Sequence, residues 1–172
     1  MNLHADAHGP ISMSKRGFIT YPLSPCDANY PNYKERIQIS DHFYVAEIDN
    51  EVRGYIMNYT FSSLRAFKQL NNNDKDVIRY FIDQCGFCDS MLYGAQIACT
   101  DDVKNTGLMR KLALFTIKNI KKNPAYIAEI ALSPIPNLVS RQFAESIMKL
   151  KLVGKRKKDG GKRLSGTFLR TF

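Results

Sequence analysis

The chain has 172 residues and a mass of 19.6 kDa, which is enough for one domain of ordinary size. With 44% hydrophobic and 24% charged residues it has the composition of a globular protein. This excludes a mostly disordered chain, a collagen-like repeat and a disulfide-stapled miniprotein. The formal net charge of +9 favours an anionic partner of some kind.

The positive charge is concentrated in the second part of the chain. Residues 1–103 carry nine basic and 13 acidic side chains, a net charge of −4. Residues 104–172 carry 16 basic and three acidic ones, a net charge of +13. The basic part therefore begins at Lys104, although a lysine-rich solvated surface would give the same count.

The sequence also carries signals about its compartment. It shows no basic stretch followed by an apolar one near its start and no apolar run of the ~20 residues that span a bilayer. We therefore expect a cytoplasmic protein with no membrane partner, in which the four cysteines are free thiols. Cys85 and Cys88 have CxxC spacing, but no second pair follows, so we expect no metal site.

Apolar periodicity and turn residues predict the elements in chain order. We expect a flexible leader at 1–15 and one domain at 16–172. In the first half of the domain we expect a strand at 17–23, a short helix at 29–40, a β-hairpin at 43–59 that turns at Asp49 and Asn50, and two short helices within 60–88. In the second half we expect a strand at 91–100, a helix at 108–122, a strand at 126–132, a helix at 137–150, and a hairpin of 151–157 and 163–172. This order indicates a single-domain α/β (α+β) fold without internal repeats.

The loop that joins the predicted strand at 91–100 to the helix at 108–122 is the best candidate for a binding site. The first amides of such a helix have no partner within the helix, and with the helix dipole they favour an anion such as pyrophosphate. Gly107 allows close approach of a ligand, and Lys104, Arg110 and Lys111 add positive charge. The loop matches neither the Walker A nor the GxGxxG pattern. An ordinary strand–helix loop containing a glycine is the alternative.

Three segments resemble the GCN5-related N-acetyltransferase (GNAT) family. They are FYVAEIDNEVRGYIMNY, IACTDDVKNTGLMRKLALFTI and PIPNLVSRQFAESIMKLKLVGKR, and the resemblance covers roughly residues 43–172. It implies an acyl-CoA N-acyltransferase-like fold with flanking helices and a mixed, mostly antiparallel sheet whose central strands splay apart. It also implies acetyl-CoA as co-substrate.

The resemblance assigns residues to the cofactor. The family's loop pattern, Arg/Gln-x-x-Gly-x-Gly/Ala, is similar to the run formed by Lys104, Asn105, Thr106, Gly107, Leu108 and Met109, whose backbone amides would hold the pyrophosphate. The strand at Ile97, Ala98 and Cys99 would splay from its neighbour at 126–132 and pair with the pantetheine arm, with an amide near Cys99 aimed at the thioester carbonyl. Asn137, with Ser140, would contact pantetheine or cap its helix.

The sequence departs from the family pattern at three positions. Lys104 replaces Arg or Gln, which matters little because backbone amides bind the phosphates. Met109 replaces a small residue and would crowd the phosphates or point into the core. Ala144 replaces the tyrosine that often serves as the acid for the leaving thiolate.

The resemblance therefore implies transfer of an acetyl group to a primary amine, on a small molecule or on a protein N-terminus or lysine. The family's usual base is a carboxylate on a central strand, and Glu129 is the candidate, because a lone acid in an apolar strand tends to have a raised pKa. A surface glutamate is the alternative. Tyr126 is the candidate acid, as is Tyr93, with aromatic core packing as the alternative for both. A homodimer, frequent in the family, stays open.

Two other functions compete with this one. The replacement at Ala144 also fits a catalytically inactive acyl-CoA-binding module of the same fold. The basic run at 155–163 would suit a nucleic-acid-binding protein, but it has few interleaved aromatic residues, so we do not expect a nucleic-acid partner. The insertion at 60–88 either shapes the acceptor site or covers one face of the sheet.

Overall fold

The computed structural model describes residues 37–66, 80–81, 88–103 and 106–172. The leader at 1–15, the strand at 17–23 and most of the helix at 29–40 that the sequence predicts lie outside these residues. The other predicted strands are present within a residue or two of their expected bounds.

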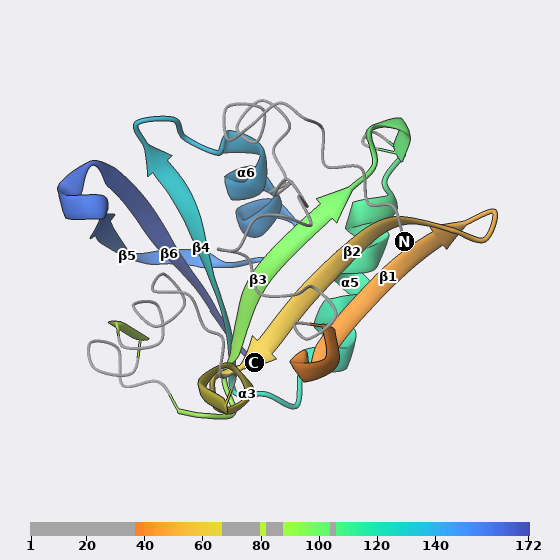
Figure 1. Cartoon of the computed structure of the whole chain (residues 1–172), viewed down its shortest axis with the longest axis horizontal. Coiled ribbons are helices and arrows are strands. Elements are labelled where there is room, and N and C mark those ends of the chain that lie inside the picture. Colours follow the sequence, from red (N-terminus) through yellow and green to blue (C-terminus); the bar gives the residue numbers. More distant parts are fainter. Residues whose placement is uncertain (1–36, 67–79, 82–87, 104–105) are drawn as a thin grey trace, which may run out of the picture.

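In the described part of the chain, six strands form one sheet in the order β1-β2-β3-β4-β6-β5. All neighbours are antiparallel except β3 and β4, which are parallel and are connected through helix α5. The strands are β1 (His42–Ile48), β2 (Glu51–Thr60), β3 (Leu92–Cys99), β4 (Ala125–Ser133), β5 (Lys151–Lys158) and β6 (Arg163–Thr171). This mixed, mostly antiparallel sheet with flanking helices confirms the predicted fold class (Figure 1).

The predicted hairpin turn of β1 and β2 is confirmed in detail. Asp49 and Asn50 both have positive φ, 53° and 60°, as a two-residue turn between twisted antiparallel strands requires. The β5–β6 hairpin turns through Asp159–Gly161, where Gly160 and Gly161 have φ of 62° and 92°. Short-range turn chemistry thus fixes both hairpins.

The sheet divides between β3 and β4. These strands pair only at Leu92, Tyr93 and Gly94, opposite Tyr126, Ile127 and Ala128. Beyond that point β3 stays paired with β2, and β4 stays paired with β6 to its end. Figure 1 shows the two strands separating into a V, which confirms the splay that the family resemblance implies.

Helices cover both faces of the sheet. Helix α5 (Leu108–Ile120) and helix α6 (Leu138–Ser146) contribute to one apolar core. Helix α3 (Phe61–Ala66) and Phe81 contribute to a second core on the other face, with Tyr80 packed against it. The described parts of the insertion therefore cover the sheet, which was one of the two alternatives. No helix in the described part of the chain is long and apolar enough to cross a bilayer.

Helix α6 is shorter than the predicted helix at 137–150. The amides of Ile147 and Met148 both bond to the carbonyl of Phe143, and Lys149 then takes a left-handed φ of 58°. A lysine in this conformation ends the helix as a glycine often does. The residues after it return under the helix, and the amide of Leu150 bonds to the carbonyl of Ala144.

Candidate functional site

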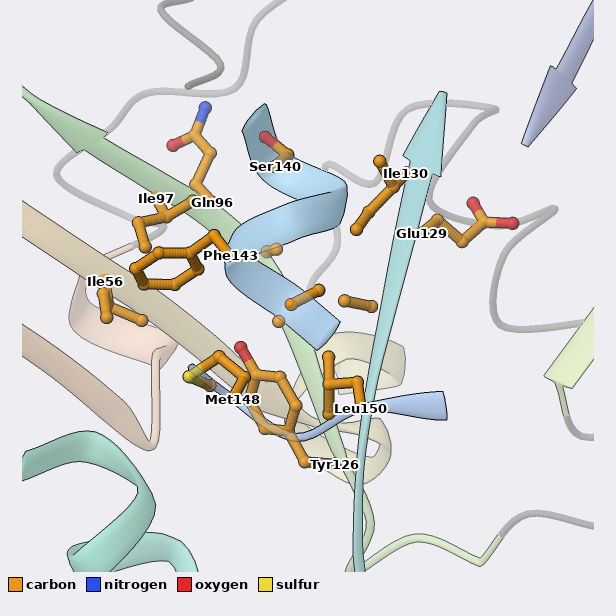
Figure 2. A pocket seen from close by; sticks show the side chains of 14 residues that line it. Ile56, Gln96, Ile97, Tyr126, Glu129, Ile130, Ser140, Phe143, Met148 and Leu150 are labelled. Atoms are coloured by element: carbon orange, nitrogen blue, oxygen red, sulfur yellow. The ribbon is translucent and has the colours of Figure 1, made fainter. Parts of the chain in front are cut away.

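The V between β3 and β4 contains a cavity of about 580 Å³, a volume that includes space open to solvent. Helix α6 lies over the V and forms one wall (Figure 2). The strands β3 and β4 form the sides, and Ile56 of β2 contributes at the base. The cavity therefore exists because two neighbouring strands stop pairing and a helix covers the gap.

The lining changes character along the cavity. Gln96, Ile97 and Ser140 are partly exposed, and Figure 2 shows them together at one end. Met148 and Leu150 are buried and lie with the Tyr126 ring at the other end. The partly exposed end carries polar side chains, whereas the buried end is mostly hydrocarbon.

Tyr126 closes the buried end with a hydrogen-bonded hydroxyl. Its Oη donates to Oδ1 of Asn58 at 2.9 Å, and Nδ2 of Asn58 donates to the carbonyl of His42 at 2.8 Å. The phenol crosses β3 above Gly94, where a Cβ would overlap the phenol oxygen. Burial raises the pKa of Tyr126 well above its ordinary value, so the group stays protonated at neutral pH. Tyr126 thus reaches the cavity that the resemblance assigns to the cofactor, as a donor already bonded to Asn58.

Glu129 points away from the cavity, although its residue borders it (Figure 2). Arg156 donates to both carboxylate oxygens at 2.8 Å, and Nζ of Lys158 lies 2.6 Å from Oε2. Burial alone would raise the pKa of this carboxyl, but the two cations outweigh it, so the pKa of Glu129 lies below its ordinary value. The expected raised pKa is therefore wrong, because Glu129 is not a lone acid. The role of Glu129 as the base stays a prediction, and no raised pKa supports it.

Helix α5 begins at the predicted anion loop. Gly107 is its N-cap, with a left-handed φ of 78°, and the amide of Leu108 donates to the hydroxyl of Thr106 at 3.4 Å. Thr106 folds back so that its hydroxyl donates to the carbonyl of Val103, and open space surrounds the position of a Cβ on Gly107. Leu108 is partly exposed, and Lys104 and Asn105 lie outside the described residues. The geometry around Gly107 suits a close approach to the first amides of α5.

Met109 points into the core, which was one of the two alternatives. Its side chain is buried, and a Cβ at Gly54 would lie 2.7 Å from its sulfur. Cys99 pairs with Gly54 at the end of β3 and does not line the cavity; nor does Ala98. Of the three strand residues assigned to the pantetheine arm, only Ile97 borders the cavity. Cys99 forms no disulfide.

Asn137 caps α6, as one of its two expected roles requires. Its side chain accepts a hydrogen bond from the backbone amide of Ser140 at 3.0 Å. Ser140 itself lines the cavity, together with Phe143 and Ala144. The spacing of these three residues along the helix puts them on one face, and this periodicity could have identified Phe143 from sequence. Gln96 carries no comparable signal, because a β-bulge at Ala95 shifts the register there.

No protein-family model matches the sequence, and no curated protein matches it either. Solved structures match the fold. A structure from Streptococcus mutans UA159 is 14% identical, with a TM-score of 0.58 over 94% of this chain and 94% of its own. A putative streptothricin acetyltransferase from Bacillus anthracis str. Ames, in complex with acetyl coenzyme A, is 14% identical, with a TM-score of 0.55 over 83% of this chain and 70% of its own.

A putative acetyltransferase of the GNAT family from Desulfovibrio desulfuricans is also 14% identical, with a TM-score of 0.54 over 76% of this chain and 68% of its own. At these identities the likeness concerns the fold. The chain has the GNAT N-acetyltransferase fold, which confirms the resemblance at that level.

Proposed function

We propose that the protein is an N-acetyltransferase that transfers an acetyl group from acetyl-CoA to a primary amine. The observation that carries this proposal is the covered cavity at the point where β3 and β4 stop pairing. The strand β3 leads from this point to the glycine that starts α5. A solved structure of the same fold was obtained in complex with acetyl coenzyme A.

The chain offers a separate place for each part of the ligand. The first amides of α5, after Thr106 and Gly107, would hold the pyrophosphate, and we assign Lys104 and Asn105 to the same loop. The pantetheine arm would follow β3 along Ile97, Ala98 and Cys99 and pass Ser140 of α6. Among the described residues, the edge of β3 that faces β4 has no ladder partner beyond Gly94, which would leave it for such pairing.

In the transfer the amine nitrogen attacks the thioester carbonyl carbon, the C–N bond forms, and the C–S bond breaks. The thiolate leaves with the electron pair, and the amine loses a proton. Holding the two substrates together in a fixed geometry can supply much of the acceleration without a covalent intermediate. Among the described residues that line the cavity, Tyr126 and Glu129 are the ionisable ones. We keep Tyr126 as the proposed acid and Glu129 as the proposed base. To act in these roles, Tyr126 would have to give up its hydrogen bond to Asn58, and Glu129 would have to give up its contacts with Arg156 and Lys158.

A catalytically inactive acyl-CoA-binding module is the second candidate. The observations that favour it are Ala144 at the position of the family's acid, the ion-paired Glu129 and the hydrogen-bonded Tyr126. Release of CoA in the presence of a panel of amines distinguishes an enzyme from a module. An enzyme releases CoA with at least one amine, whereas a module binds acetyl-CoA and releases none.

Cofactor binding is tested by replacing Gly107 with glutamate. The Gly107→Glu variant places an anion in the proposed phosphate site, and we expect the affinity for acetyl-CoA to fall by about two orders of magnitude by isothermal titration calorimetry. Gly160→Glu is the matched control, because Gly160 also has positive φ and open space around it. It carries the same strain and charge and should bind acetyl-CoA like the wild type. Equal affinities in the two variants would contradict the loop assignment.

A further inference from the structure

The buried end of the cavity has a chemical character that acetyl transfer alone does not explain. Ala144, Met148 and Leu150 are each no more than 4% exposed, and they line the cavity together with the ring of Tyr126. Acetyl is the smallest acyl group with a carbon chain, and a single methyl has little use for so much hydrocarbon surface. The walls at this end suit a longer apolar chain.

The orientation of the ligand follows from the polarity of the two ends. Gln96 and Ser140 give the partly exposed end its polar character. Toward the buried end the lining residues of α6 become Phe143 and Ala144. An acyl thioester that enters with its polar arm at the first end brings its acyl chain to the second.

Ala144 provides the room for this chain. Its small side chain lines the cavity from α6 and is buried. The cavity ends at the Tyr126 hydroxyl, which is fixed on Asn58 and limits the length of a chain in this cavity. In this binding mode Tyr126 lies at the far end of the acyl chain, away from the thioester sulfur, and is not the acid. The apolar lining at this end therefore runs from Ala144 to the Tyr126 ring.

We infer that the cavity accepts a short apolar acyl group larger than acetyl, of the propionyl-to-butyryl class, with its chain between Ala144, Met148 and Tyr126. The inference rests on the proposed function and deepens it, because the same site and the same thioester chemistry are used. Acetyl-CoA then becomes the smallest donor that the site takes.

The experiment measures the affinities of CoA, acetyl-CoA, butyryl-CoA and decanoyl-CoA for the full chain by isothermal titration calorimetry. Two additional buried methylenes should make butyryl-CoA bind on the order of tenfold more tightly than acetyl-CoA. Decanoyl-CoA, whose chain is too long for the cavity, should not show this gain in affinity over acetyl-CoA. If acetyl-CoA binds as tightly as butyryl-CoA, or more tightly, the inference is overturned while the proposed function stands. If neither CoA nor its thioesters bind, the proposed function itself fails.

A pair of variants locates the acyl chain. Ala144→Leu fills the inner end and should reduce the ratio of butyryl-CoA to acetyl-CoA affinity at least tenfold. Ser146→Leu adds a similar side chain on the exposed side of α6 and should keep the wild-type ratio. Thermal unfolding of both variants checks that they fold, and Ala144→Val replaces the leucine variant if that one does not. An unchanged ratio in a folded Ala144 variant would place the chain elsewhere and overturn the inference.

Discussion

Glu129 receives its partners from residues that are distant in sequence. Arg156 and Lys158 lie on β5, two strands away, and their side chains reach across β6 to a carboxylate whose side chain is 3% exposed. The two cations and the carboxylate tie β4 to β5 on the face opposite α6. Because one buried carboxylate holds both cations, its loss should be felt in stability before it is felt in ligand binding.

We expect Glu129→Gln to lower the free energy of unfolding by roughly 3 kcal/mol, because it leaves two half-buried cations without their carboxylate. Urea unfolding measures the loss. Glu145→Gln is the control, since its ion pair with Arg141 is exposed and is worth no more than about 0.5 kcal/mol. If both variants lose the same free energy of unfolding, the cluster of Glu129, Arg156 and Lys158 stabilises the fold no more than an exposed ion pair does.

The same carboxyl predicts a pH dependence. The folded pKa of Glu129 lies below its ordinary value of 4.5, so the unfolded chain binds this proton more readily. The stabilisation is fully present above pH 4.5 and is lost as the pH falls through the lower, folded pKa. We therefore expect the stability difference between the wild type and Glu129→Gln to be constant near neutral pH and to shrink in acid. A constant difference across this range would contradict the shift.

At the scale of elements, the vertex of the V depends on a close approach between strands. Tyr126 of β4 crosses β3 to reach Asn58 of β2, and Gly94 lets it pass. Tyr126 itself pairs with Leu92, and its phenol crosses β3 at Gly94, the last residue of β3 that pairs with β4. It therefore joins three strands at the point where the sheet divides.

We expect Gly94→Ala to cost about 2 kcal/mol of unfolding free energy, because its methyl would overlap the buried Tyr126 ring. It should also weaken acetyl-CoA binding, since the displaced ring moves toward the cavity. Gly154→Ala is the matched strand glycine; its Cβ would lie 3.5 Å from the Tyr80 hydroxyl, and its stability should stay within about 0.5 kcal/mol of wild type. Urea unfolding and calorimetry of both variants measure these effects. If Gly94→Ala is as stable as Gly154→Ala, the Tyr126 ring can move aside at low cost, and the close approach at Gly94 does not hold the strands together.

The sequence predicted the elements better than it predicted the site. The hairpin turn at Asp49 and Asn50 follows from local residue chemistry, and so does the start of α5 at Gly107. Local signals could not show that Lys149 would end α6 in a left-handed conformation, because lysine seldom adopts it. The bond between Tyr126 and Asn58 joins residues 68 positions apart, and the partners of Glu129 lie on another strand. Pairings of this kind depend on strand order, which the sequence indicated only through the family resemblance.

At the scale of the whole molecule, the charge is divided along the chain. The net charge of +13 over residues 104–172 begins at the loop before α5 and includes the lysines of β5. Lysines on an edge strand also oppose edge-to-edge pairing between molecules, so part of this charge protects β5. Arg110 and Lys111 lie exposed in the first turn of α5, next to the proposed phosphate site, whereas Lys118 lies in the last turn of that helix.

We expect the affinity for acetyl-CoA to fall by about tenfold as the salt concentration rises from about 0.05 to 0.5 M, because the ions screen the attraction between phosphates and basic side chains. S-acetylpantetheine, which lacks the nucleotide phosphates, should bind more weakly and with little dependence on salt. Calorimetry at several salt concentrations provides both curves. If the two ligands show the same salt dependence, the nucleotide phosphates are not among the groups that the protein recognises.

The parallel pairing of β3 and β4 puts the starts of two helices at one rim of the sheet. Both strands open at the same edge, and each continues into a helix, α5 or α6, that begins at that edge. Two helix dipoles thus direct their positive ends to one rim of the V. Substitutions in α3 and around Tyr80 and Phe81 fall on the other face of the sheet. Substitutions there should leave the rim, with the proposed phosphate site at the start of α5, in place.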